Sequence, residues 1–112
     1  MSRITEREYE QYRSQIRQLE GEWQTKEDQI KVAISNEEDN LCLIQEECMK
    51  LNREQDRYYE DPQLMALLEQ KNEQLNQARY EEEQILEDLY QERRNLDNQM
   101  EGAIGEIRRM MY

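Results

Sequence analysis

The fold depends on five residues near the middle of the chain, Tyr58-Tyr59-Glu60-Asp61-Pro62, which include its single proline. Proline disfavours helical geometry at the residue before it, but it fits the first position of a helix, where its missing N–H costs nothing. Asp61 is a favourable N-cap residue in front of such a helix. The stretch therefore predicts that one helix ends near Tyr59 and that another begins at Pro62.

On both sides of this turn, apolar side chains recur at steps of three, four or seven residues. This heptad spacing, with polar residues between, is typical of helices that pack along a narrow seam. No alternation typical of a β-strand is sustained. The stripe before the turn is Tyr9, Tyr12, Ile16, Leu19, Trp23, Ile30, Ile34, Leu41, Ile44, Cys48, Leu51 and Tyr58, and the stripe after it is Leu64, Leu68, Leu75, Ala78, Leu86 (or Ile85), Leu89, Leu96, Met100, Ala103, Ile107 and Met110.

Two helices of similar length joined by a tight turn predict an all-α fold, an antiparallel two-helix hairpin of coiled-coil type. The first helix should span about residues 3–59 and the second about 62–110, so that residues 1–112 form a single hairpin. The turn itself is expected at Glu60-Asp61-Pro62.

The hairpin also predicts which residues face each other. If the turn is centred near Asp61, the numbers of facing residues sum to about 122, which places Trp23 opposite Gln99 and Met100. Gly102 and Gly105 then lie beside the indole. We expect these glycines to provide room for it, because bulky side chains pack best against small ones.

The heptad phase of the first helix slips by four residues between Trp23 and Ile34. Ser35 followed by Glu38 has the pattern of a capping box, which would favour a chain break at that point. The other interpretation is a continuous helix that relaxes its supercoil. We prefer the continuous helix because no glycine or proline lies in this stretch.

The composition excludes several classes of protein. The chain has 15 basic and 27 acidic side chains, a net charge of −12, which disfavours binding to nucleic acid or to anionic membrane surfaces. A low content of aliphatic residues together with this net charge is typical of disordered chains. However, Ala, Glu, Lys, Leu and Arg make up 51 of the 112 residues, which is typical of long helices. The sequence has no histidine. We expect no catalytic site, no metal site and no cofactor, and thus no enzyme.

No apolar stretch approaches the roughly 20 residues of a membrane span. The densest is residues 64–68, so we predict no membrane insertion. The N-terminal region contains no apolar run of the kind found in Sec signal peptides. We therefore expect a cytoplasmic protein, with any export following a non-Sec route together with a partner.

The acidic runs Glu37-Glu38-Asp39, Glu46-Glu47 and Glu81-Glu82-Glu83 could bind a divalent cation or a basic partner. The ligand spacing of an EF-hand is absent, however. Charge runs on long helices are usually solvated, so we expect these residues to be exposed.

Polar residues interrupt the predicted seam and weaken an isolated hairpin. They are Lys26, Glu37, Gln55, Lys71 and Arg93. Two helices that share about a dozen apolar pairs barely offset the entropy lost on ordering them. We therefore expect further burial, either against another helical protein or by self-association. The candidate partner-binding residues are Leu43, Leu67 and Ile85, which lie beside the seam, and the off-stripe tyrosines Tyr59, Tyr80 and Tyr90.

An acidic helical hairpin of 112 residues, for which we expect no Sec leader, resembles the WXG100-like proteins of type VII secretion. More narrowly, it resembles the small helical companions of LXG toxins in type VIIb systems. This resemblance implies a chaperone or targeting factor that binds the N-terminal helical domain of a toxin. The turn Glu60-Asp61-Pro62 replaces the Trp-x-Gly turn, Trp23 lies within a helix, and no tyrosine has Asp or Glu four residues on, as the usual export signal requires.

The chain also resembles the coiled-coil stalk and chaperone proteins of type III secretion. That resemblance implies a structural homo-oligomeric scaffold or stalk. Two functions are thus predicted: a non-enzymatic partner of another helical protein, or a self-associating spacer.

Overall fold

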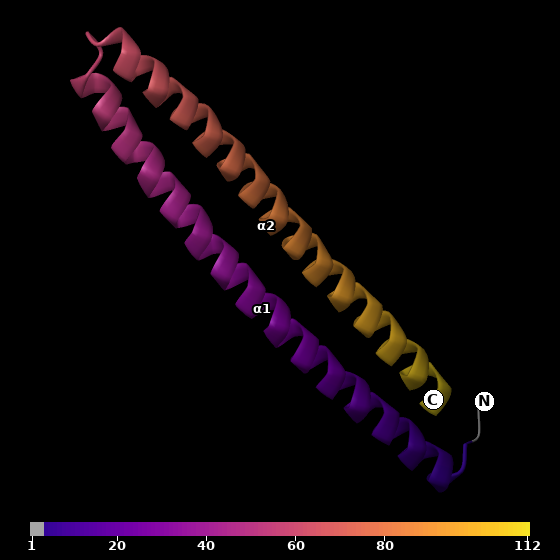
Figure 1. Ribbon diagram of the computed structural model, residues 1–112. Coiled ribbons are helices and arrows are strands. Elements are labelled where there is room, and N and C mark those ends of the chain that lie inside the picture. The colour runs from indigo at the N-terminus through magenta and orange to yellow at the C-terminus, as the bar shows by residue number, and fades with distance from the viewer. Residues whose placement is uncertain (1–3) are drawn as a thin grey trace. The chain divides into compact units, whose positions relative to one another are not determined.

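The computed structural model describes residues 4–112, which form two helices, α1 (Glu6–Arg57) and α2 (Pro62–Met111), and no strand (Figure 1). The predicted all-α hairpin with its turn at residues 60–62 is confirmed. The expected helix start at residue 3 lies outside the described residues, and residues 4 and 5 precede α1. The first helix ends two residues earlier than predicted, at Arg57, and the second ends at Met111.

An N-cap that the sequence analysis did not single out sets the start of α1. The Thr5 hydroxyl oxygen Oγ1 accepts a hydrogen bond from the backbone N–H of Glu8 at 3.1 Å. It also donates to Glu8 Oε1 at 3.1 Å. Because a capping side chain satisfies an N–H that has no partner within the helix, Thr5 favours a helix that begins at the next residue.

The turn between the helices is closed by a hydrogen bond from the backbone N–H of Asp61 to the carbonyl oxygen of Tyr58, at 3.0 Å. Asp61 Oδ1 then accepts hydrogen bonds from the N–H groups of Gln63 and Leu64, both at 3.1 Å. Pro62 is the first residue of α2. The predicted N-cap and the predicted N1 proline are therefore both present.

We expect Asp61→Ala to lower the free energy of unfolding by about 1 kcal/mol, because two N–H groups lose their acceptor. Urea unfolding followed by circular dichroism measures the change. The matched control is Glu60→Ala, which removes an exposed neighbouring carboxylate that forms no cap and should leave stability nearly unchanged. Equal effects of the two substitutions would contradict the capping role.

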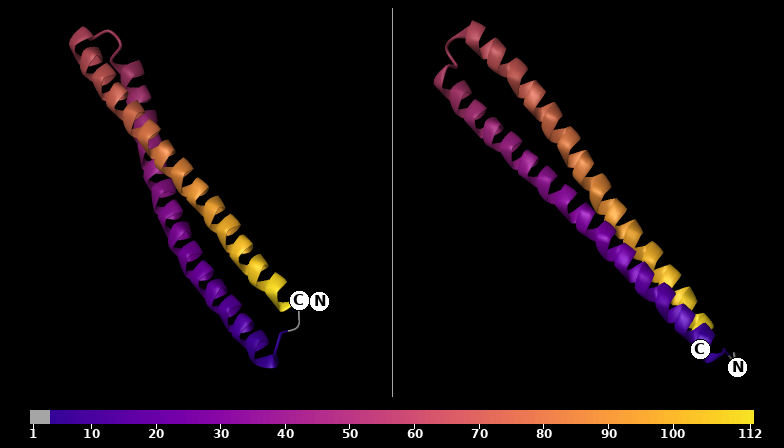
Figure 2. Two further views of the ribbon diagram at one scale, coloured as in Figure 1. Left: turned by 90° about the vertical axis from the view of Figure 1, so that its right-hand side faces the viewer. Right: turned by 60° about the horizontal axis from the view of Figure 1, so that its bottom comes forward.

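Contacts between the helices divide the chain into two units. Among the described residues, unit 1 comprises 4–32 and 89–112, and unit 2 comprises 33–88 with the turn. In each unit a segment of α1 lies antiparallel to a segment of α2, as the two further views also show (Figure 2). Helix α1 runs without interruption through Ser35, so the continuous helix is confirmed and the capping box does not break it.

The core is a thin line of apolar side chains along the seam. Leu51 is the one described residue that is fully buried, with 1% of its surface exposed. The buried apolar residues are Ile30, Ile34, Leu51, Leu68, Leu86, Leu96, Met100, Ile104 and Met111. Many other apolar residues of the seam, such as Leu19, Leu41 and Leu75, are only half-buried, so the burial that offsets the ordering of two long helices is modest.

The register differs by two residues from the prediction. Trp23 is hydrogen-bonded to Asp97 and Glu27 to Arg93, and in both pairs the residue numbers sum to 120 rather than about 122. Trp23 thus pairs with Asp97, and the predicted position opposite Gln99 and Met100 is wrong. The turn is centred midway between the two helix ends, between residues 59 and 60, rather than at Asp61.

Three of the five polar residues predicted on the seam are half-buried: Glu37, Gln55 and Arg93. The prediction is wrong for Lys26 and Lys71, which are exposed, and their neighbours Glu27 and Asn72 are half-buried instead. The reason for the first difference is the phase slip. The extra four-residue step falls directly after Trp23, and this rotates position 27 onto the seam and position 26 away from it.

The glycines near the end of α2 do not provide room for the indole, contrary to the prediction. Apart from the nearby backbone of α2 itself, a Cβ atom added to Gly102 or Gly105 would have no atom within 4 Å. No described glycine adopts a positive φ angle. Neither close packing nor backbone conformation therefore requires glycine at these positions.

We expect Gly102→Ala and Gly105→Ala each to raise the free energy of unfolding by about 0.5–1 kcal/mol, since alanine restricts the unfolded chain and favours the helix. Thermal unfolding of each variant measures this effect. Gly21→Ala in α1 is the matched comparison, because its added Cβ is also free of contacts. If Gly102→Ala and Gly105→Ala lowered the melting temperature while Gly21→Ala raised it, the α2 glycines would have a packing role.

Candidate functional site

All six residues predicted to contact a partner are exposed, with between 36% and 68% of their surfaces accessible. They are Leu43, Tyr59, Leu67, Tyr80, Ile85 and Tyr90. Five of them belong to unit 2 and Tyr90 belongs to unit 1. Exposure makes these side chains available for contact but does not by itself identify an interface.

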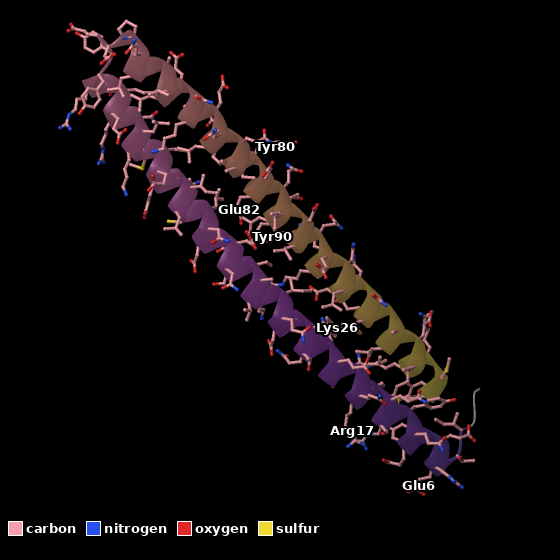
Figure 3. The ribbon with its side chains drawn as sticks, viewed as in Figure 1. Glu6, Arg17, Lys26, Tyr80, Glu82 and Tyr90 are labelled. Carbon is pink, nitrogen blue, oxygen red and sulfur yellow. The ribbon has the colours of Figure 1, made fainter. Side chains whose placement is uncertain are left out.

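The exposed residues of α2 in unit 2 do not form one compact patch. Leu67 and Ile85 are 18 residues apart. That spacing corresponds to five helical turns, so the two side chains share a face of the helix at a separation of roughly 27 Å. Tyr80 projects from α2 on the side away from α1 (Figure 3). This spacing suits contact with an elongated partner better than with a small ligand.

The structure exposes further large apolar side chains that the sequence analysis did not assign to contacts. They are Val32, Met49, Tyr58, Met110 and Tyr112. The prediction that Tyr58 and Met110 lie on the seam is wrong, because both side chains are exposed. Tyr58 lies in the turn because α1 ends at Arg57, while Met111 rather than Met110 is buried near the end of α2. Among the described residues, eleven large apolar side chains are exposed and nine apolar residues are buried.

Polar contacts hold the helices in register in unit 1. Trp23 Nε1 donates a hydrogen bond to Asp97 Oδ1 at 2.9 Å, in a partly buried position. One helical turn further along α1, Glu27 Oε1 accepts a hydrogen bond from Arg93 Nη2 at 3.2 Å. Because each contact requires one particular pair of facing residues, the two together specify a single alignment of the helices.

The seam of unit 2 contains two carboxylates that face each other. Glu82 has only 9% of its surface exposed, and in Figure 3 it lies on the side of α2 nearest α1. The prediction of an exposed acidic run is therefore wrong for Glu82, whereas Glu81 and Glu83 are exposed as expected. Glu82 Oε1 has no hydrogen-bond partner, and Glu37 is half-buried.

A hydrogen bond with Glu37 raises the pKa of Glu82 above its ordinary value, and burial and charge repulsion from Glu37 raise it further. Asn40 Nδ2 donates a hydrogen bond to Glu37 Oε2 at 3.4 Å. Two close carboxylates cannot both ionise without repulsion, so a proton shared between Glu82 and Glu37 relieves the contact. We therefore expect the stability of unit 2 to depend on pH.

Within residues 4–112, no group of three or more His, Cys, Asp or Glu side chains is placed to hold a metal ion. Cys42 and Cys48 are both free thiols. Neither helix of this described part is long and apolar enough to span a bilayer.

Comparisons of the chain with protein-family models, with curated proteins and with solved structures found no match.

Proposed function

We propose that this chain is a non-enzymatic partner protein, whose hairpin completes its own packing against the helices of another protein. The partner contributes apolar side chains that cover those left exposed on the hairpin, and the hairpin in turn shields the apolar surface of the partner. This is the task of a chaperone or targeting factor. It fits the companion role that the resemblance to LXG toxin partners of type VIIb secretion implies.

The observation that carries the proposal is the ratio of exposed to buried apolar side chains. Eleven large apolar residues are exposed and only nine apolar residues are buried among those described. Dispersed exposed apolar residues are common on folded proteins. Here, however, the fully buried set is small, and many seam residues, such as Leu19, Leu41 and Leu75, are only half-buried. Contact with another helix offers further burial to these side chains.

The net charge favours a different protein over a second copy as the partner. Each chain carries a charge of −12, so two copies repel each other. A self-associating scaffold or stalk would have to overcome this repulsion along the helices. A partner with basic helices would instead be attracted.

The first experiment is light scattering on the purified chain, which we expect to show a monomer of 13.8 kDa. The second is co-expression with the N-terminal helical domain of the LXG toxin encoded nearest to this chain. We expect a complex with an equal number of both chains and a higher melting temperature than the hairpin alone. A stable dimer or tetramer would overturn the proposal in favour of the scaffold, and a genome without an LXG toxin would overturn the toxin assignment.

Paired substitutions locate the interface. We expect Leu67→Asp combined with Ile85→Asp to weaken the complex at least roughly tenfold, because each change places a charge in an apolar contact. The matched control is Gln70→Asp combined with Gln84→Asp, which adds the same charge to α2 of unit 2 at exposed polar positions. If the control weakened the complex and the Leu67→Asp, Ile85→Asp variant did not, the interface would lie elsewhere on the hairpin.

A further inference from the structure

Charge is distributed unevenly between the two units. Residues 33–88 carry 16 acidic and five basic side chains, whereas residues 1–32 and 89–112 together carry 11 acidic and ten basic ones. Nearly all the negative charge of the protein therefore belongs to unit 2. Unit 1 is almost neutral, and part of its surface is positively charged.

Three arginines of unit 1 line a groove of about 270 Å³ between the N-terminal part of α1 and the end of α2. Arg13 and Arg17 come from α1 and Arg108 from the last turn of α2. Glu20 contributes the one acidic side chain of the lining. The groove thus has a net positive lining in a protein whose net charge is −12.

The arginines are not held by strong internal pairs. Arg108 Nη2 lies 4.0 Å from Glu20 Oε1, and Arg13 Nη1 lies 3.7 Å from Glu10 Oε1, with all four side chains more than half exposed. Exposed pairs at such distances contribute little to stability. Arg17 forms no ion pair with another described residue. A ligand carboxylate can therefore replace these contacts at small cost.

Helix electrostatics explain only one of the three arginines. A cation in the last turn of a helix interacts favourably with the helix dipole, which accounts for Arg108. Arg13 and Arg17 lie in the third and fourth turns of α1, beyond the first turn in which the dipole acts. Their convergence on Arg108 needs another reason, and recognition of an anion provides one.

The rest of the lining indicates what kind of anion fits. The Arg13 guanidinium carbon lies 6.0 Å from the centre of the Tyr9 ring, a stacking arrangement that orients its N–H groups. Ile16 and Met111 add apolar surface to the same groove. The guanidinium group of arginine can donate two parallel N–H hydrogen bonds to the two oxygens of a carboxylate. The apolar lining offers a place for an aliphatic side chain between two such carboxylates.

We propose that the groove formed by Arg13, Arg17 and Arg108 binds an acidic peptide segment in which carboxylates flank an aliphatic side chain. An inorganic phosphate would use the arginines but would leave the surface of Ile16 and Met111 uncovered. None of the six predicted partner-contact residues lines this groove, so the site does not depend on the proposed function, and either can fail without the other.

The test uses the full chain and the peptide fluorescein-Gly-Glu-Glu-Leu-Glu-Glu-Leu-amide, labelled at its N-terminus, with fluorescence anisotropy at low ionic strength. We expect binding that weakens as salt is added, because exposed charge pairs are screened. Backbone amide NMR shifts should change mainly for residues 9–20 and 108–112. A peptide with Gln in place of every Glu is the ligand control, and inorganic pyrophosphate is the competing anion.

The triple variant Arg13→Gln, Arg17→Gln and Arg108→Gln should bind the acidic peptide about tenfold more weakly, since each exposed charge pair contributes a factor of roughly 1.5 to 5. Its matched control is Arg53→Gln, Arg57→Gln and Arg79→Gln, which removes the same charge from unit 2. Circular dichroism checks that both variants keep their helices.

Four outcomes would overturn the proposal. They are no binding of the acidic peptide, equal binding of the Gln peptide, equal losses in the two triple variants, and pyrophosphate binding more tightly than the peptide with the same NMR shifts. The last result would identify a phosphate site in place of a peptide site. Peptide binding that requires the groove arginines and the Glu side chains supports the proposal.

Discussion

Replacing Leu51 with alanine is expected to lower the free energy of unfolding by about 2–5 kcal/mol, the largest effect of any substitution considered for this chain. Leu51 has 1% of its surface exposed, and no other described side chain is buried so completely. The register places Leu68, itself buried, opposite it. Truncation removes two methyl groups and the carbon that carries them, and it leaves a space that the two facing helices cannot close without losing other contacts.

Urea unfolding monitored by circular dichroism measures this change. The matched control is Leu43→Ala, the same substitution on the same helix, where the side chain is 60% exposed. We expect the control to change stability by less than about 0.5 kcal/mol. Similar effects at the two positions would contradict the conclusion that the apolar side chains of the seam stabilise the hairpin.

The second large effect is a gain in stability from Glu82→Gln, by about 1–2 kcal/mol at neutral pH. The substitution keeps the size of the side chain and removes the charge that repels Glu37. It also replaces a buried acceptor that lacks a partner with an amide that can donate to the Glu37 carboxylate. Few substitutions at a buried polar position are expected to stabilise a protein, so the sign of the change is a sensitive test.

The same pair determines how stability depends on pH. The pKa of Glu82 is raised in the folded protein above the ordinary value of 4.5, so the folded state binds this proton more tightly than the unfolded state. The stabilising contribution is therefore fully present below about pH 4.5 and is lost as pH rises through the folded pKa. The hairpin should unfold at higher temperature in mild acid than at neutral pH, and Glu82→Gln should reduce this difference.

Glu81→Gln and Glu83→Gln are the controls, because each removes one negative charge from the same helical turn at an exposed position. They correct for the general repulsion in a unit that carries 16 acidic side chains. If either control stabilised the protein as much as Glu82→Gln, the net charge of unit 2 rather than the buried pair would be the cause.

The local signals in the sequence were sufficient for the fold class and the turn. Asp61 and Pro62 act through their own backbone and side-chain chemistry, so an N-cap and an N1 proline can be recognised without knowing what packs nearby. The heptad spacing likewise needs only the period of a helix. The exposure of Leu43, Leu67 and Tyr80 follows from the same period, because each lies off the apolar stripe.

The prediction of an exposed acidic run is wrong at Glu82, although the spacing of apolar residues pointed to its position. The predicted stripe after the turn has a gap of eight residues between Ala78 and Leu86, and Glu82 lies at its centre. The spacing therefore contained the signal, but an acidic residue within an acidic run suggested an exposed face. Only its position opposite Glu37 makes the residue unusual, and that position depends on how the second helix lies against the first.

Two helices, the turn between them and the apolar side of each can be predicted from local sequence, because these properties depend on neighbours within a few residues. The register depends on how the helices lie against each other, and it sets the pairing of Trp23 with Asp97, the contact between Glu82 and Glu37, and the convergence of Arg13 with Arg108. A difference of two residues in the length of the turn changes every facing pair while leaving each helix the same. Periodicity is therefore a local property, whereas the identity of facing residues depends on the whole path of the chain.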